Sequence, residues 1–390
     1  MYCPMRLIGD DMRVVMIRTN GVNPDPRVEK EVNSIIKDGN NSVIVLAWDR
    51  ESNHSSDSIL QLSNGIARII RFGVPSEWGG GFKKNLLPLL KFSVKVHKWL
   101  KSHVNEYDCL HCCDLPTAMM ASPYIKRKKF VYDIYDYFAD TAHAPKVVLD
   151  YARNKENAMI EMADVTIICS EQRVRQLGNA KPRRLEVIHN SPDSSLLDKV
   201  ISEEKHIIKS DSKKKKIVYV GNLIRERYID IVADVISQMS DVEFHVGGVG
   251  PLSETLENIS KEKTNIFFYG KMVYSDVIAL EHDCDYMLAL YDPEVPNNRF
   301  AAPNKFYEAL LLGKPIIMCR NTGMDAVVSE KNYGVVIEPT RQSIEDGINR
   351  LISQGNDWAN KVGKDMKKTY EELYSWKTMD NRLSNIYKEL

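Results

Sequence analysis

One stretch in the C-terminal half of the chain carries polar side chains at a spacing suited to binding a phosphorylated sugar. Pro303 suits the first position of a helix, and Gly313 suits its end. The free N–H groups of a helix N-terminus attract phosphate, and Asn304 and Lys305 lie in that first turn. Glu308 falls on the same face as Asn304, where its carboxylate could accept both hydroxyls of a ribose. A capped surface helix with solvated Lys305 and Glu308 has the same spacing, so both interpretations stay open.

The elements that must position this stretch alternate between short apolar runs and amphipathic segments. Near-continuous apolar runs are typical of parallel strands covered on both faces. The first group of predicted strands lies at 12–18, 42–48, 67–72, 108–112, 130–134, 164–169 and 185–189. The second group lies at 216–220, 242–246, 265–269, 285–290, 315–319 and 334–338. Between the groups, the polar segment 191–216 is predicted to be a linker or a domain edge.

This alternation predicts an α/β protein with two doubly wound domains. We expect an N-terminal domain at 1–195 and a C-terminal domain at 196–365. The last segment, 366–390, is predicted to be helical and could pack back on the N-terminal domain. Ligands of open α/β sheets bind at the carboxyl ends of the strands, so the loops after the strands are the candidate sites.

The composition narrows the class of protein. Lys+Arg and Asp+Glu both number 53, and a nucleic-acid binder usually has a basic excess, so we expect no nucleic-acid partner. The first residues are polar, and no apolar run approaches the roughly 20 residues of a membrane span. These features predict a cytoplasmic protein.

The seven cysteines point to reduced thiols rather than to a metal site. Cys109, Cys169 and Cys319 lie in apolar runs, which suits buried thiols in the cytoplasm. Cys109, Cys112 and Cys113 are close enough together for a metal site. However, no second Cys/His pair at zinc spacing follows, so we expect no bound metal.

Several short motifs occur in a fixed order along nearly the whole chain. They are ADVTIICS at 163–170, VIHN through Asp193 at 187–193, YVGNL at 219–223, GGVGP at 247–251, FYG at 268–270, PNKFYEALLLGKP at 303–315 and YSW at 374–376. Together they resemble the retaining family 4 glycosyltransferases, which have the GT-B fold. The resemblance implies two Rossmann-like domains facing each other across a deep cleft. It also implies a hexosyltransferase that uses a nucleotide sugar, with UDP as the expected nucleotide.

The resemblance implies roles in a donor site in the C-terminal domain. Glu308 matches the Glu that binds the donor ribose, whereas Phe300 stands where family members usually have a Glu that contacts the transferred sugar. Asn222 replaces the usual Arg after the first strand of this domain, and Arg227 falls where a Lys is usual, with Arg225 as a second candidate. An arginine can hold two oxygens of a diphosphate, although surface arginines remain an alternative. The full predicted donor site is Gly221, Asn222, Arg225, Arg227, Gly248, Asn304, Lys305 and Glu308.

The N-terminal domain is expected to bind the acceptor. Family members often show two His at the end of the fourth strand, where this chain has His111 and, in the second place, Cys113. His111 could donate to the leaving phosphate or to a sugar hydroxyl, or it could be a satisfied His at a strand end. Asp133 and Asp136 follow the next strand, and Asp136 is the better candidate for an acceptor hydroxyl because it lies past the strand end. Acidic residues at a strand end are also common turn formers.

Three further candidates lie at loops of the N-terminal domain: Gly21, Arg27 and Asp114. Arg27 opens a helix and could touch the donor phosphate or the acceptor, or form a salt bridge at the helix start. No Ser-His-Asp pattern or nucleophile elbow is present in the sequence. The resemblance implies transfer on one face of the sugar, helped by the phosphate of the donor, so that catalysis relies on positioning and charge. It implies no permanent cofactor and no metal.

Residues 82–101 form a basic amphipathic segment with six lysines and no acid. Trp78 and three glycines precede it, and its apolar residues share one helical face: Leu89, Phe92, Val96, Trp99 and Leu100. Such a segment is typical of helices that lie on anionic membranes, but a packed helix with solvated lysines also fits. On the membrane interpretation the acceptor is lipid-linked, as in bacterial surface polysaccharide biosynthesis. The protein would then be peripheral on the inner face of the cell membrane.

Two other functions remain as alternatives. A nucleotide-sugar epimerase has the same two-domain fold, but it needs an acid/base set around the sugar that the sequence does not supply. A non-catalytic homologue that binds nucleotide sugar or glycan would explain Phe300 and Asn222, which depart from the pattern of the family.

Overall fold

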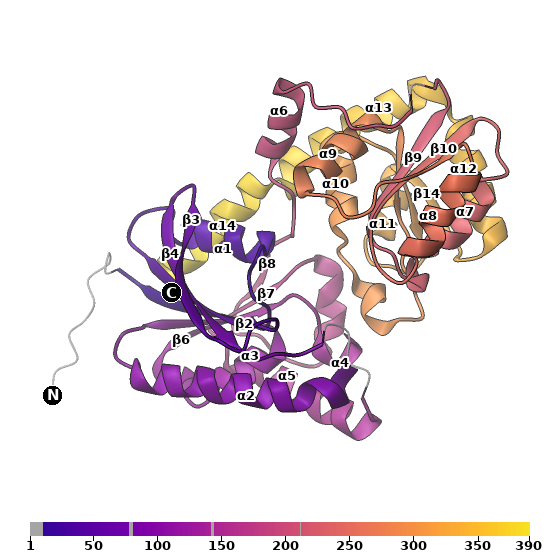
Figure 1. Ribbon diagram of the computed structural model, residues 1–390. Helices are drawn as coiled ribbons and strands as arrows, with labels where there is room; N and C mark the ends of the chain where they lie inside the picture. Colours follow the sequence, from indigo (N-terminus) through magenta and orange to yellow (C-terminus); the bar gives the residue numbers. More distant parts are fainter. Residues whose placement is uncertain (1–10, 78–80, 142–143, 211) are drawn as a thin grey trace. The chain divides into compact units, whose positions relative to one another are not determined.

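The computed structural model describes residues 11–77, 81–141, 144–210 and 212–390, without the side chains of 81–83. The predictions for residues 1–10, for Trp78 and for the side chains of Phe82 and Lys83 fall outside these residues. The chain forms two compact units (Figure 1). The first contains Met1–Ile188 and Met379–Leu390, and the second contains His189–Thr378. The sequence placed its domain boundaries at 195 and 365, whereas these divisions fall after Ile188 and after Thr378.

The first unit is built on an eight-stranded sheet with the order β3-β4-β2-β1-β5-β6-β7-β8. Its strands are β1 Arg13–Arg18, β2 Ser42–Asp49, β3 Ser56–Leu62, β4 Gly65–Gly73, β5 Cys109–Cys113, β6 Lys129–Ile134, β7 Val165–Ile168 and β8 Leu185–Val187. All pairs are parallel except β3 with β4. The seven predicted strands are confirmed, and β3 was missed. β3 is an edge strand whose residues are exposed or half-buried, so it has no apolar run.

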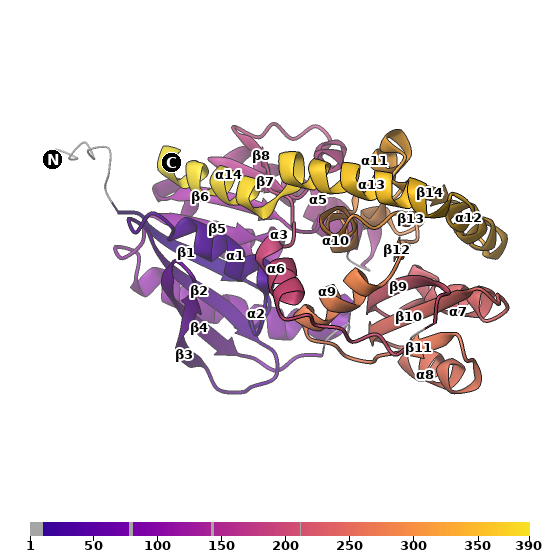
Figure 2. The same cartoon turned by 90° about the horizontal axis from the view of Figure 1, so that it is seen from above.

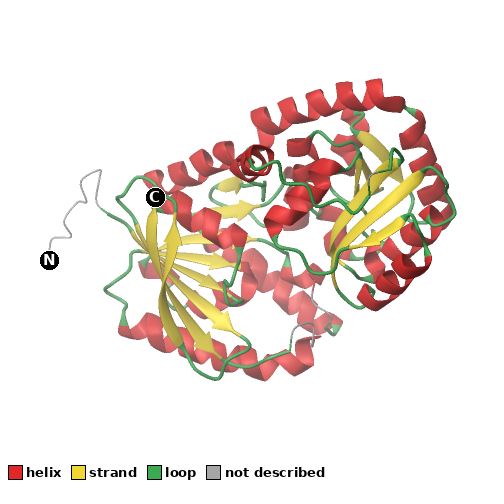
Figure 3. Ribbon diagram, turned by 45° about the horizontal axis from the view of Figure 1, so that its top comes forward, coloured by secondary structure: helices red, strands yellow, loops and turns green. Residues whose placement is uncertain are grey.

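Helices cover both faces of this sheet (Figure 3). They are α1 Pro26–Ile35, α2 Gly81–Ser102, α3 Asp114–Ala121, α4 Phe138–Thr141, α5 Lys146–Met162 and the end of α14 Trp376–Glu389, with short 3-10 turns at Ile125–Arg127 and Glu171–Leu177. α1 begins where the sequence supplies a cap, because the Asp25 side chain accepts from the backbone N–H of Val28 and Pro26 follows. α2, α3 and α5 lie together on one face, and α1 lies on the other (Figure 1).

The apolar face predicted for membrane contact is instead the core face of α2. Phe92, Val96 and Leu100 are fully buried in the core of the first unit, and Leu89 and Trp99 pack against that core. The packed-helix alternative is therefore correct for these five residues. Periodicity identifies an apolar stripe on a helix but not what covers it. No helix in the described part of the chain combines the length and the apolar character needed to cross a membrane.

The second unit has a six-stranded parallel sheet with the order β11-β10-β9-β12-β13-β14. Its strands are β9 Lys215–Asn222, β10 Val242–Val249, β11 Ile266–Phe268, β12 Tyr286–Ala289, β13 Ile316–Cys319 and β14 Gly334–Ile337, and all six were predicted. Reading along the sheet, the chain order is 3-2-1-4-5-6, the arrangement of a doubly wound fold. The strand order reverses between β9 and β12, and in the first unit it reverses between β1 and β5. These two points are the expected ligand sites of such sheets.

The helices of the second unit pack on its sheet in two apolar clusters, one on each face. The helices are α6 Ser194–Ser202, α7 Ile229–Ile236, α8 Ser253–Glu262, α9 Tyr274–Asp283, α10 Asn304–Leu312, α11 Asp325–Lys331, α12 Arg341–Ser353 and α13 Gly355–Thr369. α6 lies inside the segment 191–216, which was predicted to be a linker. Its start is capped by Asp193, whose side chain accepts from the N–H of Ser195.

The C-terminal tail is helical, as predicted. After a π-helical turn at Tyr370–Tyr374, α14 runs to Glu389, and its residues from Met379 onward belong to the first unit. There it lies beside β8, where Arg184 Nη1 is 2.7 Å from Glu389 Oε2 (Figure 2). Lys37 Nζ, just past α1, pairs with Asp380 at 2.5 Å. The chain's last helix is thus an integral part of the first unit.

Candidate functional site

The helix that carries the predicted donor residues begins and ends close to where the sequence placed its limits. α10 starts at Asn304, with Pro303 as the extended N-cap residue (φ −68°, ψ 136°) rather than the first helical residue. The fixed φ of proline fits either position. Gly313 ends the helix in the left-handed region at φ 67°, as predicted.

Lys305 and Glu308 are buried against each other, not solvated. Lys305 Nζ lies 3.3 Å from Glu308 Oε2 and 3.3 Å from Oε1 of Glu281, which comes from α9. The hydroxyl of Tyr274 donates to Glu308 Oε1 at 2.9 Å. The Lys305 side chain is 12% exposed, and the two glutamates are almost fully buried. The interpretation of a surface helix with solvated Lys305 and Glu308 is therefore wrong.

The charges in this group, here called the lysine cluster (Tyr274, Glu281, Lys305 and Glu308), are unequal. Burial, and then the charge of Glu308, raise the pKa of Glu281 to about 8. Burial opposes the charge on Lys305, but the two carboxyl groups outweigh it and raise the pKa of its ammonium group. Glu281 Oε2 is buried without a hydrogen-bond partner in the described part of the chain. Glu281 therefore holds a proton at neutral pH.

Two glycines at the strand ends bring the backbone close to the lysine cluster. A Cβ added at Gly221, near the end of β9, would lie 3.6 Å from Lys305 Cε. Gly248 on β10 has φ 129°, and a Cβ there would lie 1.8 Å from the carbonyl oxygen of Gly221. No other residue type fits at position 248 without moving the backbone. Both predicted glycines therefore lie at the carboxyl edge of the sheet, and Gly221 borders Lys305.

Arg227 is the second cation at this edge. It lies in the 3-10 turn Arg225–Arg227 after β9, with its guanidinium 3.5 Å from the ring centroid of Tyr291. Tyr219, on β9, has Lys305 Nζ 5.7 Å from its ring centroid. Burial raises the pKa of Tyr219 to about 12, while the nearby charges of Lys305 and Arg227 lower it. The two cations thus approach the same tyrosine at the point where the strand order reverses.

The other predicted donor residues lie at the margin of this group. Asn304 is exposed, and its Oδ1 accepts from Asn190 Nδ2 at 2.9 Å. Asn222 has an exposed side chain and accepts the Tyr219 hydroxyl on its backbone carbonyl at 2.9 Å. Arg225 is exposed on its turn. Two cations, closely approached strand ends and a buried carboxylate can together hold a diphosphate and a pair of sugar hydroxyls.

In the first unit, the strand ends at the reversal point are joined by Arg18. Its Nη1 donates to Asp114 Oδ2 at 2.9 Å and its Nε to Asp25 Oδ2 at 3.1 Å. Asp114 has φ 68°, and its Oδ1 accepts from the backbone N–H groups of Tyr135 and Asp136. Burial raises the pKa of Asp114 to about 6, although Arg18 opposes this. Asp114 therefore fixes the turn, and Arg18, which was not predicted from the sequence, anchors it.

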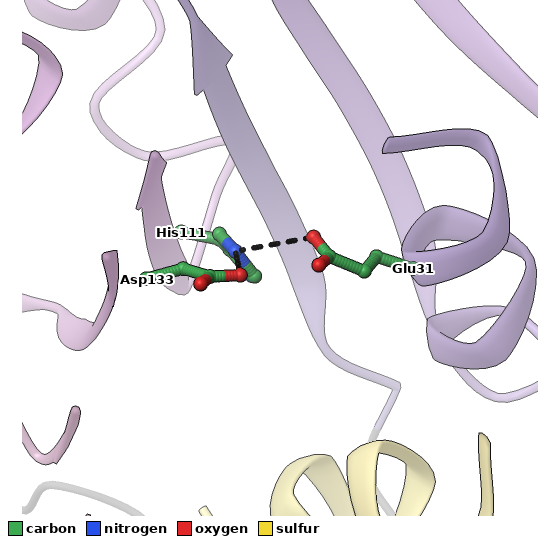
Figure 4. A group of neighbouring side chains, drawn as sticks. All are labelled: Glu31, His111 and Asp133. Carbon is green, nitrogen blue, oxygen red and sulfur yellow. Dashed lines mark ion pairs between the residues drawn. The ribbon is translucent and has the colours of Figure 1, made fainter. Parts of the chain in front are cut away.

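Arg27, Glu31, His111 and Asp133 form a second buried ionic group, here called the arginine cluster. Figure 4 shows Glu31, His111 and Asp133. Arg27 Nε is 2.8 Å from Glu31 Oε1, and Nη2 is 2.9 Å from Asp133 Oδ1. His111 Nε2 is 3.3 Å from Asp133 Oδ2, and its Nδ1 is 2.5 Å from the hydroxyl of Tyr387 on α14. Arg27 was expected either to touch a ligand or to form a salt bridge, and in the structure it forms buried salt bridges.

The arginine cluster is better suited to a proton than to a metal ion. One ligand atom each from Glu31, His111 and Asp133 can be chosen so that all lie within 4.8 Å of one another. However, Arg27 already bonds an oxygen of each carboxylate, and its positive charge opposes a cation there. Burial and the charge of Asp133 raise the pKa of Glu31 to about 7. Burial also acts against the charge on Asp133, but Arg27 and His111 outweigh it and lower its pKa.

The two residues predicted to be catalytic differ in their exposure to solvent. His111 is fully buried, and only its Nδ1 meets a hydrogen-bond partner, the Tyr387 hydroxyl, in the described part of the chain. The side chain of Asp136 is 58% exposed, and its Oδ1 is 3.1 Å from Arg173 Nη2. Of these two predicted residues, only Asp136 is accessible.

Gly21 lines a pocket of about 370 Å³ formed by the loops after β1 and β2 and by Arg71 of β4. The Arg71 guanidinium donates to the carbonyl oxygens of Gly21 and Val22 at 2.7 and 3.0 Å. Asp49 and Glu51 also line the pocket. Its mixed charge and backbone carbonyls suit the hydroxyls of a sugar.

The cysteines near His111 do not form a thiolate site. Cys109, Cys112 and Cys113 are all buried and free. Burial raises the pKa of each thiol, which disfavours the thiolate form in this structure.

Comparison with known proteins relates the chain to glycosyltransferases. Residues 200–369 match the family model of the glycosyl transferases group 1. No curated protein matches the chain. The chain is similar to a sucrose-phosphate synthase from Thermosynechococcus elongatus, with 15% identity, a TM-score of 0.72 and coverage of 97% of this chain and 98% of that one.

Two other solved structures are similar over the same extent. A trehalose-6-phosphate protein from E. coli bound with UDP-2-fluoro glucose has 10% identity and a TM-score of 0.68, with 97% and 99% of the two chains covered. HepE from Anabaena in complex with UDP has 15% identity and a TM-score of 0.64, with 97% and 100% covered. With the family match, these similarities confirm the predictions of the GT-B fold class and of a hexosyltransferase.

Proposed function

We propose that this protein is a retaining glycosyltransferase of family 4 that transfers a sugar from a nucleotide sugar, with UDP as the nucleotide, to a glycan or lipid-linked acceptor. The observation that carries the proposal is the lysine cluster at the reversal point of the second sheet, next to Gly221 and Arg227. Cations beside closely approached strand ends suit a diphosphate, and a buried carboxylate next to them suits the hydroxyls of a ribose.

In this proposal, Arg227 and Lys305 hold the diphosphate and Glu308 holds the ribose. Each oxygen of Glu308 now has one polar contact, to Tyr274 or to Lys305, and a carboxylate oxygen can accept a second. A bound diphosphate attracts the Lys305 ammonium away from the two glutamates. Glu308 Oε2 then becomes available to a ribose hydroxyl, and the protonated Glu281 adds no repulsive charge.

The chemical step needs little beyond positioning and charge. The acceptor hydroxyl attacks the anomeric carbon while the bond from that carbon to the diphosphate oxygen breaks, and the hydroxyl proton passes to the departing phosphate. Arg227 and Lys305 stabilise the negative charge that develops on the leaving diphosphate. The N-terminal unit binds the acceptor, and Asp136 orients the acceptor hydroxyl because its carboxylate is accessible.

The acceptor class and the place of action extend the proposal. A lipid-linked acceptor of bacterial surface polysaccharide biosynthesis fits a protein that works at the inner face of the cell membrane. The lysine-rich helix α2 supports such a peripheral contact, through the side of the helix that faces away from the core.

A thermal-shift screen with UDP, GDP, ADP and their sugar conjugates tests the donor site. A ligand that binds the folded protein raises the melting temperature. The screen is run on the wild type, on Arg227→Ala and Glu308→Gln, and on Arg341→Ala as a control for removing an exposed arginine. We expect one nucleotide to shift the wild type and the control, with the shift lost in the two site variants.

The same samples separate the alternatives. No shift with any nucleotide would remove the basis of the donor-site assignment. A thermal shift together with conversion of the nucleotide sugar to an isomer, without sugar transfer to an acceptor, would indicate an epimerase. Binding without turnover on any acceptor would favour the non-catalytic homologue that Phe300 and Asn222 motivate.

A further inference from the structure

Helix α2 has a second apolar surface that is not covered by the described part of the chain. Its core face is already occupied by Phe92, Val96 and Leu100. On its outer side the exposed fractions are 40% for Leu86, 61% for Leu87, and 54% for both Leu90 and Val94. Leu87, Leu90 and Val94 follow one another at helical spacings of three and four residues, so they share one face. A contiguous exposed apolar surface of this kind marks an interaction site.

This surface forms one wall of a groove of about 660 Å³ in the first unit. Leu87, Leu90 and Val94 line it from the helix, and Val74 and Pro75, which follow β4, line it as well. A groove with apolar walls along its length suits an extended hydrocarbon chain.

The polar residues at this groove are almost all lysines. Lys91 and Lys98 line it, are exposed, and form no ion pair within the described ranges. Lys95 is held in place, since its Nζ donates to the carbonyl oxygen of Gly73 at 3.1 Å. The sequence of α2 contains no acidic residue that could neutralise them. The charge complement of this surface is therefore an anion, located next to an apolar chain.

We infer that the groove beside α2 binds the hydrocarbon chain of an anionic phospholipid when the protein lies on a membrane. Leu87, Leu90 and Val94 contact the chain, and Lys91 and Lys98 contact the lipid phosphates. The inference rests on the proposed membrane contact and adds the surface, the groove and the class of lipid. It assigns the contact to the opposite side of α2 from the apolar face that the sequence singled out.

Vesicle flotation measures the surface contact. The full-length protein is mixed with vesicles of phosphatidylcholine alone or with phosphatidylglycerol added, at low and at high salt. We expect binding to the anionic vesicles only. Lys91→Gln with Lys98→Gln should weaken it about 20- to 30-fold, since each lysine near an anionic surface contributes roughly a fivefold change. Lys361→Gln with Lys364→Gln removes two exposed lysines elsewhere and should leave binding unchanged.

A plug in the groove distinguishes chain entry from simple adsorption. Val94→Trp fills the groove but keeps the surface apolar. If the hydrocarbon chain of the lipid enters the groove, this variant binds anionic vesicles at least tenfold more weakly than the wild type. It also binds monomeric lyso-phosphatidylglycerol at least tenfold more weakly. If the helix only lies on the surface, the added indole strengthens binding, and the inference is overturned. Leu90→Ser with Val94→Ser should weaken binding similarly, whereas Ile59→Ser with Ile66→Ser, at equally exposed positions, should not.

The remaining outcomes also decide. Equal binding to neutral vesicles, or none to anionic vesicles, contradicts the inference. A change in mass on sedimentation with Leu90→Ser and Val94→Ser would assign the surface to a second copy of the chain instead. The nucleotide thermal shift, measured on every variant, serves as the check on folding. If that shift persists while vesicle binding fails, the lipid groove is wrong and the donor site stands.

Discussion

Each unit buries two carboxyl groups against one cation, but the cations differ in kind and in geometry. In the arginine cluster, separate N–H groups of Arg27 reach Glu31 at 2.8 Å and Asp133 at 2.9 Å. In the lysine cluster, the single ammonium of Lys305 lies 3.3 Å from each of its two glutamates. The planar guanidinium of Arg27 also lies 3.5 Å from the ring centroid of Tyr135, so the tyrosine ring covers one of its faces.

This difference separates a structural charge from one that can serve a ligand. A guanidinium with its donors fixed on two carboxylates loses several bonds if it moves, whereas an ammonium on a flexible stem can exchange partners at small cost. The longer distances around Lys305, and its position beside the exposed Asn304, support the proposal that it meets a phosphate. We therefore propose different roles for two basic residues at helix starts, Arg27 and Lys305, because their surroundings differ.

Removing the arginine should have the largest effect on stability. Arg27→Met leaves Glu31 and Asp133 buried without their cation, and breaking a buried ion pair costs about 3–5 kcal/mol. Urea denaturation should show this loss in the free energy of unfolding. Arg153→Met, which breaks an exposed pair with Asp140, should cost less than about 1 kcal/mol. A loss for Arg27→Met no larger than for this control would show that the cluster is not structural.

Removing Lys305 should reduce the free energy of unfolding less than removing Arg27 does, but it should weaken nucleotide binding. Lys305→Met leaves two carboxyl groups together, but Glu281 is already protonated at neutral pH, so we expect a loss of about 2 kcal/mol. Nucleotide binding should weaken at least tenfold because one of the two diphosphate cations is gone. Calorimetric titration with the nucleotide that shifts the wild type checks this. Unchanged affinity in Lys305→Met would contradict the proposed role of the lysine cluster.

The comparison also shows what could be predicted from the sequence. The parallel strands were found because burial on both faces requires near-continuous apolar runs. The edge strand β3 was missed because its residues are exposed or half-buried and therefore form no apolar run. Lys305 was found because it lies in the first turn of a predicted helix, and Glu308 because it shares a face with Asn304, four residues earlier, and matches the motif of the family.

What the sequence could not supply is contact between elements. Glu281 is 24 residues from Lys305 in the chain and leaves no local pattern. The contact between the Tyr387 hydroxyl and His111 joins residues that are 276 positions apart, so it leaves no local pattern either. This contact helps to bury His111, a candidate catalytic residue. For α2, spacing identified an apolar face but could not tell that it is the core face, nor that exposed leucines follow on the other side.

The proton on Glu281 should make the stability of the lysine cluster depend on pH. The folded state holds this proton up to about pH 8, whereas the unfolded chain releases it near pH 4.5. The folded state therefore binds more protons between these values, and the free energy of unfolding falls by up to about 1.4 kcal/mol per pH unit as pH rises. Glu281→Gln cannot release a proton, so its stability relative to the wild type should increase from pH 5 to pH 8. Urea denaturation across this pH range measures the difference in the free energy of unfolding between Glu281→Gln and the wild type. A constant difference would count against a protonated Glu281 in the folded state.

The smallest effects come from a matched pair of tyrosines. Tyr135 donates to Glu31 Oε2 at 2.8 Å in the arginine cluster, and Tyr274 donates to Glu308 Oε1 at 2.9 Å in the lysine cluster. Replacing either by Phe removes one hydrogen bond to a buried carboxyl group and keeps the ring, so each should cost about 1 kcal/mol. Only Tyr274→Phe should also weaken nucleotide binding, by a few-fold, because Glu308 loses the bond that orients it toward the ribose. If both variants bound nucleotide as well as the wild type, Tyr274 would only support the fold. If Tyr135→Phe weakened binding equally, the separation of a structural cluster from a ligand-binding one would fail.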